Sequence, residues 1–193
     1  FLKSITKNDE FVVKNTNSKD SIRKAPAPFT TSTLQQDAST KLRFNVKRTM
    51  SAAQKLYEAG MITYMRTDST NLSQQALNEC KEYIVKNYGK EYSDPKNYNK
   101  KKSKGAQEAH EAVRPTKIAV ESANGKLSSD CEKLYKLIRN RTLASQMANA
   151  VIEVQTISID LLENKKSKLP KDTLFVSQLE NVKFDGYLVL YNN

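Results

Sequence analysis

The run MITYMRTDST, residues 61–70, separates two helical patterns of the chain. The first pattern stops at Gly60, because glycine readily adopts the backbone conformation that ends a helix. The second begins at Asn71, a residue type that caps helix N-termini. Between them we expect a short β-like segment over residues 61–65. Tyr64 and Arg66 stand two positions apart in this β-like run, so we expect both to project to one face.

Two shorter helices precede this run. The hydroxyl residues 30–33 predict the cap of a helix that ends near Leu42, and a second helix is expected over residues 47–59. The stiff connector APAP, residues 25–28, marks a boundary because no helix crosses it. Two helices joined by a tight turn at residues 44–46 are typical of a helix-turn-helix, although most such pairs only pack together.

Helical spacing also continues downstream. The second pattern extends to Tyr88, and the capping box SDCE, residues 129–132, opens a helix to about Ala148. Residues 90–106 form a loop with the basic run KKKSK, residues 100–104. This basic run is interpreted either as a solvated loop or as a loop that contacts phosphates.

Strand patterns lie at both ends of the chain. Residues 10–14 form a short strand candidate, followed by the turn-rich run 15–20. After the last helix, three strands are expected over residues 151–162, 173–179 and 183–191. The order of strand, helices and strands predicts an α+β chain in which a helical domain is inserted into a β domain.

The chain has 193 residues, a net charge of +11, a pI near 9.5 and a mean hydropathy of −0.68. This basic excess favours an anionic partner, nucleic acid first and a membrane surface second, although a Lys- and Asn-rich composition raises the charge by itself. No apolar run approaches the ~20 residues that span a bilayer, and the first residues lack signal-peptide features. Cys80 and Cys131 lie in apolar helical patterns and are expected to be buried thiols, with a disulfide as the alternative.

Tyr64 is a candidate nucleophile. A phenol has a pKa of about 10 and attacks poorly without help. Arg66 offers that help, because a guanidinium stabilises a phenolate and binds two phosphate oxygens at once. Asp68 is expected to orient the arginine, and the hydroxyl of Thr67 to bond a phosphate or cap the next helix. Attack on a phosphodiester needs about this set; the alternative is a packed tyrosine beside a surface arginine.

His110 is the only histidine and stands between Glu108 and Glu111, four residues before Arg114. Near neutral pH a histidine carries a proton or, when charged, binds a phosphate; the alternative is a structural or surface residue. No metal site is expected, because a second histidine is missing and the cysteines are distant.

Three runs closely resemble three motifs of bacterial-type DNA topoisomerase I, a type IA topoisomerase, in the family's order. They are APFTTSTLQQDAST (27–40), KLYEAGMITYMRTDSTNLS (55–73) and QEAHEAVRPT (107–116). The close resemblance covers residues 25–116, and the patterns that follow fit the family's layout.

The resemblance implies that Tyr64 attacks one DNA strand, forms a transient 5′-phosphotyrosine bond and later reseals the strand, so that negative supercoils are relaxed without ATP. Arg66 matches the arginine that positions the scissile phosphate, and His110 matches a histidine that binds or polarises DNA there. Four other motif residues are implied as DNA contacts: Arg114, Asp68, Thr67 and Gln107. The same motifs also contain Glu108, and Thr33, Gln35 and Gln36 as structural support.

The resemblance also implies the domain organisation. A mainly helical domain with helix-turn-helix-like (CAP-like) packing, residues 26–150, is expected between strands of an arch domain, residues 1–25 and 151–193. Family members carry a Toprim domain whose acidic residues bind Mg²⁺, and no D-x-D-x-E cluster is present here. The chain is therefore expected to be a fragment that binds no cofactor and does not relax DNA alone.

The expected partners are DNA, mainly single-stranded, and the missing Toprim and gate domains of the parent chain, with no membrane. We expect a monomer in the cytoplasm, associated with the nucleoid if the source is bacterial. Without the Toprim domain, the cleft face of Tyr64 is expected to be open to solvent. The alternative function is a non-catalytic single-stranded DNA-binding module of the same fold.

Overall fold

The computed structural model describes residues 10–98, 111–123, 127–162 and 173–191. The chain forms two compact units. The sheet unit comprises Phe1–Arg23 and Ala150–Asp185, and the helical unit comprises Lys24–Asn149 and Gly186–Asn193. Strands and helices occupy different units, which confirms the α+β prediction. The CAP-like packing of the helices stays a prediction.

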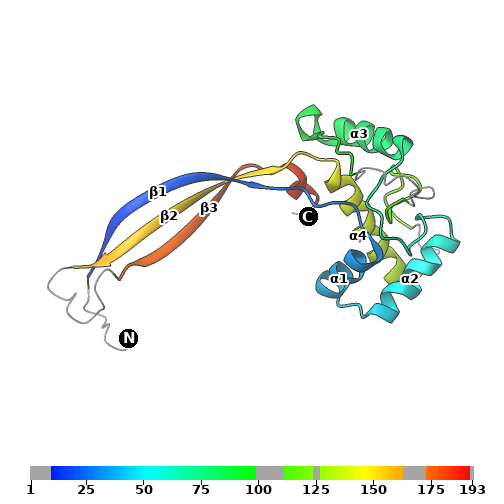
Figure 1. Cartoon of the computed structure of the whole chain (residues 1–193), viewed down its shortest axis with the longest axis horizontal. Helices are drawn as coiled ribbons and strands as arrows, with labels where there is room; N and C mark the ends of the chain where they lie inside the picture. Colours follow the sequence, from blue (N-terminus) through cyan, green and yellow to red (C-terminus); the bar gives the residue numbers. More distant parts are fainter. Residues whose placement is uncertain (1–9, 99–110, 124–126, 163–172, 192–193) are drawn as a thin grey trace, which may run out of the picture. The chain divides into compact units, whose positions relative to one another are not determined.

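The sheet unit contains three antiparallel strands in the order β1-β2-β3, which run side by side (Figure 1). They are β1 (Phe11–Arg23), β2 (Ala150–Leu161) and β3 (Phe175–Phe184). The central strand, β2, has the sequence AVIEVQTISIDL, whose β-branched residues favour an extended backbone.

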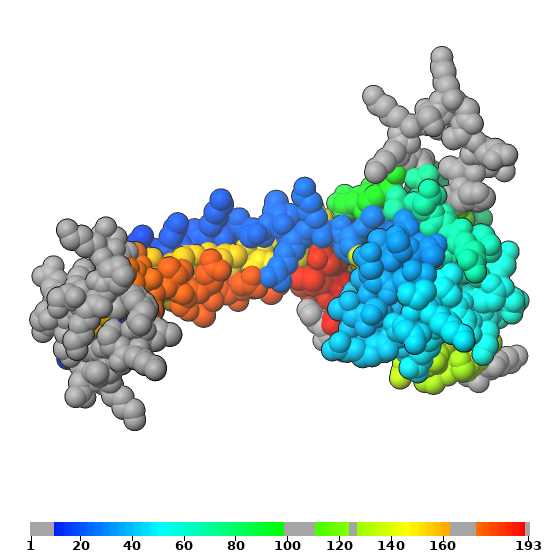
Figure 2. All heavy atoms as spheres, turned by 60° about the horizontal axis from the view of Figure 1, so that its bottom comes forward, coloured from blue at the N-terminus to red at the C-terminus, as the bar shows by residue number. Residues whose placement is uncertain are grey.

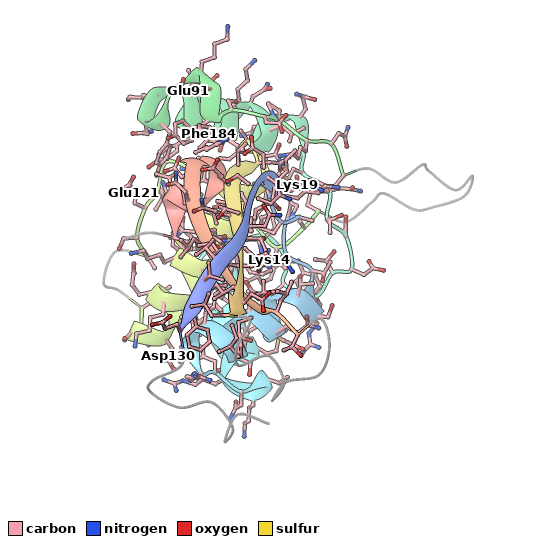
Figure 3. The ribbon with its side chains drawn as sticks, turned by 90° about the vertical axis from the view of Figure 1, so that its left-hand side faces the viewer. Lys14, Lys19, Glu91, Glu121, Asp130 and Phe184 are labelled. Atoms are coloured by element: carbon pink, nitrogen blue, oxygen red, sulfur yellow. The ribbon has the colours of Figure 1, made fainter. Side chains whose placement is uncertain are left out.

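The strand β1 is longer than predicted. The prediction of a turn-rich run over residues 15–20 is wrong, because these residues pair one by one with residues 153–158 of β2. The register shifts between Val13 and Asn15, where Lys14, labelled in Figure 3, forms a bulge. Pairing with a strand rich in β-branched residues outweighs the local turn preference of Asn, Ser and Asp.

The C-terminal segment also differs from the prediction. Instead of two strands over residues 173–179 and 183–191, the chain forms β3 and then a short 3-10 helix, η4 (Gly186–Leu190). Gly186 has a φ of +50°, and a Cβ atom there would lie 2.5 Å from the carbonyl oxygen of Ala148. This close approach of two backbone segments ends the strand, and it is a long-range contact that the alternating pattern does not reveal.

The helical unit contains four α-helices among its described residues. They are α1 (Thr31–Leu42), α2 (Val46–Glu58), α3 (Gln74–Tyr88) and α4 (Ser129–Ser145), and a 3-10 turn, η2 (Lys90–Tyr92), follows α3. A side-chain oxygen caps each α-helix, from Thr30, Asn45, Ser73 and Ser128 respectively. The helices α1 and α2 lie where the sequence predicts them.

The ends of two helices differ from the prediction. The helix α3 is capped by Ser73 and not by Asn71, whose carbonyl oxygen instead accepts a hydrogen bond from the Ala112 backbone N–H at 2.8 Å. The helix α4 is capped by Ser128 and ends before Ala148. Beyond the end of α4, the backbone N–H of Ala148 donates to the carbonyl oxygen of Tyr92 at 2.9 Å, so a contact with a distant segment accompanies the start of α3 and the end of α4.

Two apolar clusters hold the helical unit together. The first joins α1, α2 and α4 around Phe29, Leu56 and Tyr135, and the second joins α3 to α4 around Cys80 and Leu143. Both cysteines are buried free thiols, as predicted, and burial raises the pKa of Cys80 to about 12. The helices α1 and α2, drawn in blue to cyan, form much of the surface of this unit in Figure 2.

Candidate active site

Residues 61–70 form an irregular segment of the helical unit, and residues 61–65 do not form the predicted β-like strand. An isolated bridge pairs Ile62 with Pro115. The Thr63 hydroxyl donates a hydrogen bond to the carbonyl oxygen of Ala112 at 2.6 Å. These contacts join the tyrosine-bearing run to the AVRPT end of the third motif, although the two are far apart in sequence.

Tyr64 lies on the outer side of this segment. Its neighbours Ile62 and Met65 are buried in the core, whereas the Tyr64 side chain is 47% exposed. Its ring contacts that of Tyr57 in α2 edge to face, with 5.3 Å between the centroids and 64° between the planes. Both rings line a pocket of about 290 Å³, whose other lining residues are Thr63, Thr67 and Glu111. The phenol is thus accessible to a ligand from solvent.

Arg66 and Asp68 are both exposed. Within the part of the chain that the structure describes, neither side chain forms an ion pair or a hydrogen bond, so the expected orienting contact from Asp68 to Arg66 is not formed. The guanidinium of Arg66 therefore remains available to an anion, two residues from Tyr64.

The N-terminus of α1 fixes the backbone on both sides of Arg66. The Thr31 hydroxyl donates to the carbonyl oxygen of Met65 at 2.7 Å and accepts from the backbone N–H of Thr67 at 2.8 Å. The Thr31 backbone N–H donates to the carbonyl oxygen of Thr67 at 2.9 Å. The sequence did not single out Thr31, although it lies within the first motif; the predicted Thr33 instead completes the capping box of α1.

The side chain of Thr67 is engaged within the protein. Its hydroxyl accepts a hydrogen bond from the backbone N–H of Ser69 at 3.1 Å. Ser69 in turn accepts one from the backbone N–H of Asn71 at 3.1 Å. These two contacts shape the turn between the tyrosine-bearing run and α3, while Thr67 still borders the pocket beside Tyr64.

A half-buried ion pair, between Glu111 and Arg114, supports the same pocket. Glu111 accepts from the backbone N–H of Ser73, the cap of α3, at 2.6 Å and from the Arg114 guanidinium at 2.6 Å. Burial disfavours the charged carboxylate, but the hydrogen bonds from Arg114 and Ser73 outweigh it and lower the pKa of Glu111. A carboxylate at the N-terminus of α3 is also favoured by the helix dipole.

This arrangement gives Arg114 a structural role. The side chain is 12% exposed, and its guanidinium also donates to the carbonyl oxygen of Pro115 at 2.8 Å. Arg114 therefore braces the loop that carries Glu111 in this structure, and the DNA contact that the family resemblance implies for it stays a prediction.

Three further predicted site residues, Gln107, Glu108 and His110, lie outside the described residues, as does the basic run at residues 100–104. Their roles stay predictions. The structural roles of Gln35 and Gln36, which lie within α1, also stay predictions.

Among the described residues, no group of three or more His, Cys, Asp or Glu side chains gathers where it would hold a metal ion. The described residues also include no helix with the length and apolar character needed to cross a membrane.

Comparison with known proteins places these features in a family. The family model described as DNA topoisomerase matches residues 1–193. The chain is 42% identical over 192 residues to the prokaryotic-type DNA topoisomerase 1 of Acanthamoeba polyphaga mimivirus, covering 99% of this chain and 22% of that protein. It is 42% identical over 198 residues to DNA topoisomerase 1 of Campylobacter jejuni, covering 97% of this chain and 27% of that protein.

A solved structure agrees with the sequence comparisons. Full-length topoisomerase I from Thermotoga maritima superposes with a TM-score of 0.81 at 35% identity, covering 100% of this chain and 31% of the other. The chain thus spans less than a third of the length of these relatives. The matched family model, the identities and the shared fold agree, and the chain belongs to the bacterial-type DNA topoisomerase I family, the type IA topoisomerases.

Proposed function

We propose that this chain is the tyrosine-bearing part of a longer DNA topoisomerase, and that Tyr64 cleaves and reseals one DNA strand. The observation that carries the proposal is the exposed phenol of Tyr64 at a pocket, with the exposed guanidinium of Arg66, which has no partner among the described residues, two positions away. A nucleophile and an anion-binding group on one short segment are what attack on a phosphodiester requires.

In the proposed step, the phenolic oxygen of Tyr64 forms a bond to phosphorus while the bond from phosphorus to the 3′ oxygen of the neighbouring nucleotide breaks. The phenol loses its proton to solvent, and the departing 3′ oxygen takes up one proton. One phosphodiester is exchanged for another, so the reverse step reseals the strand without ATP.

Arg66 is proposed to bind the non-bridging oxygens of the phosphate, where negative charge increases in the transition state. The hydrogen bonds of Thr31 to the residues on both sides of Arg66 hold its backbone in place. Thr63, through its bond to Ala112, and the Glu111–Arg114 pair support the same pocket. Correct placement of reacting groups is worth several orders of magnitude in rate, so these contacts serve catalysis indirectly.

The remaining functions of the enzyme are proposed to reside in other parts of the parent chain. The Toprim domain of the family would bind Mg²⁺, and the described residues of this chain offer the ion no such group. We further propose that the substrate strand is single-stranded, that the isolated chain does not relax supercoiled DNA, and that the parent enzyme acts in the cytoplasm as a monomer.

The test compares the full-length protein that carries this chain with its Tyr64→Phe variant. Cleavage of a labelled single-stranded oligonucleotide and binding of the same oligonucleotide are measured in parallel. We expect the variant to lose cleavage and to keep most of its binding, because only the nucleophilic oxygen is removed. Cleavage that survives in the variant would rule out Tyr64 as the nucleophile.

A matched control is Tyr98→Phe, which removes a phenol oxygen whose partner is the carbonyl oxygen of Ser145 in the same unit. This control is expected to cleave at the wild-type rate. Wild-type protein that binds the oligonucleotide and never cleaves it would favour the alternative function, a single-strand-binding module. The net charge of +11 is the observation that supports this alternative.

A further inference from the structure

The second tyrosine of the pocket, Tyr57, has no role in the reaction as proposed above. It lies in the last turn of α2, directly after the buried Leu56, and is 41% exposed. Gly60, with a φ of +69°, turns the chain directly after the helix, so that the following segment brings Tyr64 back against Tyr57. Two large aromatic side chains are thereby held together at the surface, where an aromatic residue gains little from burial.

The surroundings of these two rings suit a nucleoside. An edge-to-face pair leaves part of each ring face uncovered, and the pocket beside them has a volume of about 290 Å³. The hydroxyl residues Thr63 and Thr67 line it. Among its described lining residues, the one carboxylate is Glu111, whose charge is paired with Arg114.

The proposed covalent step determines which nucleoside comes closest. In a 5′-phosphotyrosine, the phosphorus is bonded to the Tyr64 oxygen and, through the 5′ oxygen and carbon, to one sugar. The base of that nucleotide is therefore tethered within a few bonds of Tyr64, and the Tyr57 ring centroid lies 5.3 Å from the Tyr64 centroid. Aromatic side chains bind single-stranded bases by stacking on their faces, without preference for a particular base.

We propose that Tyr57 is a base-binding residue, on whose ring the base of the nucleotide joined to Tyr64 stacks. The proposal rests on the proposed function, because the linkage to Tyr64 identifies the nucleotide. Stacking there holds the cleaved 5′ end beside its phosphate while the strand is open, and it favours the covalent state over release.

The test uses the full-length protein and two labelled single-stranded oligonucleotides of one sequence. In the second oligonucleotide, the nucleotide whose 5′ phosphate becomes linked to protein is replaced by an abasic sugar. The yield of covalent adduct is measured for the wild type, Tyr57→Leu and Tyr57→Phe. The control is Val46→Ala, which trims a 58% exposed apolar residue in the first turn of the same helix.

The loss of stacking with one base predicts that Tyr57→Leu lowers the equilibrium constant for formation of the covalent adduct on the intact oligonucleotide by about 5-fold to 150-fold. The wild type should show the same loss on the abasic oligonucleotide, and Tyr57→Leu should show no further loss there. Tyr57→Phe, which keeps the ring, and Val46→Ala should behave as the wild type on both.

Equal losses for Tyr57→Leu on both oligonucleotides would overturn the proposal, since Tyr57 would then only position the Tyr64 ring. A wild type that does not distinguish the two oligonucleotides would overturn it as well, and this comparison does not depend on how any variant folds. If the proposed function itself were wrong, the wild type would form no adduct on Tyr64 with either oligonucleotide, which is a different result.

Discussion

Replacing Thr31 with valine removes the side-chain hydrogen bonds by which α1 holds the tyrosine-bearing run. Valine keeps the β-branched shape of threonine and loses only the hydroxyl. That hydroxyl makes two short hydrogen bonds, to the carbonyl oxygen of Met65 at 2.7 Å and from the backbone N–H of Thr67 at 2.8 Å, and its proton is shared with the carbonyl oxygen of Thr67 at 3.1 Å. Both partners are backbone groups that flank Arg66, so the change frees the segment that carries the proposed phosphate-binding charge.

The size of the effect follows from these two bonds. A hydrogen bond contributes about 1 kcal/mol net, and a buried partner left unpaired costs about 1–3 kcal/mol, so the free energy of unfolding should fall by about 2 kcal/mol. The bond from the Thr31 backbone N–H to the carbonyl oxygen of Thr67, at 2.9 Å, remains, so the fold should survive. A displacement of reacting groups by about 1 Å costs roughly 100-fold in rate, so cleavage should fall by about 10-fold to 100-fold.

Denaturant unfolding followed by circular dichroism measures the stability, because the chain contains no tryptophan for fluorescence. Adduct formation in the full-length protein measures the cleavage rate. Thr31→Ser keeps the hydroxyl and should stay near the wild type. Thr40→Val removes an exposed bond to the carbonyl oxygen of Gln36 in the same helix and should leave cleavage unchanged. Wild-type stability and cleavage in Thr31→Val, or equal damage in Thr31→Ser, would refute the reasoning.

Three further changes test other parts of the structure. The hydrogen bonds from Arg114 and Ser73 lower the pKa of Glu111 in the folded protein. The stability that Glu111 contributes is therefore present above its unfolded pKa of about 4.3 and is lost as the pH falls through the lower folded pKa. Melting curves of Glu111→Gln should lack this loss at low pH, and a pH profile that matches the wild type would exclude the pairing. Gly186→Ala should lower the free energy of unfolding by at least about 1–2 kcal/mol, because the added Cβ atom would lie 2.5 Å from the carbonyl oxygen of Ala148. An unaffected melting temperature would contradict the close approach of these two backbone segments. Arg66→Ala should lower the cleavage rate by about 100-fold and lower DNA binding far less. The control Lys47→Ala removes an exposed cation of α2 and should leave cleavage unchanged. Equal losses of cleavage and binding in Arg66→Ala would show that Arg66 acts in ground-state binding of DNA.

The sequence predicted correctly those structural features that depend on interactions between residues close together in the chain. The capping hydroxyls at residues 30–33, the stop at Gly60 and the apolar spacing around Cys80 and Cys131 gave the helices and the buried thiols. These features depend on residues within one or two turns of each other, so their patterns are visible in the chain itself.

Long-range contacts account for the errors. The run at residues 15–20 has the composition of a turn, but pairing with β2 makes it part of a strand. Gly186 ends β3 because the backbone of Ala148 lies against it. In the site, the family motifs pointed to Tyr64 and Arg66, whereas the support from Thr31 depends on residues that meet only in the folded chain.

The identity of the residue that bonds to DNA is the central claim. The full-length protein, with Mg²⁺ supplied, is incubated with a labelled single-stranded oligonucleotide and quenched with denaturant, and the covalent adduct is digested and mapped by mass spectrometry. The account predicts one modified peptide, with the 5′ phosphate of the cleaved strand on the oxygen of Tyr64. An adduct on any other residue, or oligonucleotide binding with no adduct at all, would contradict it.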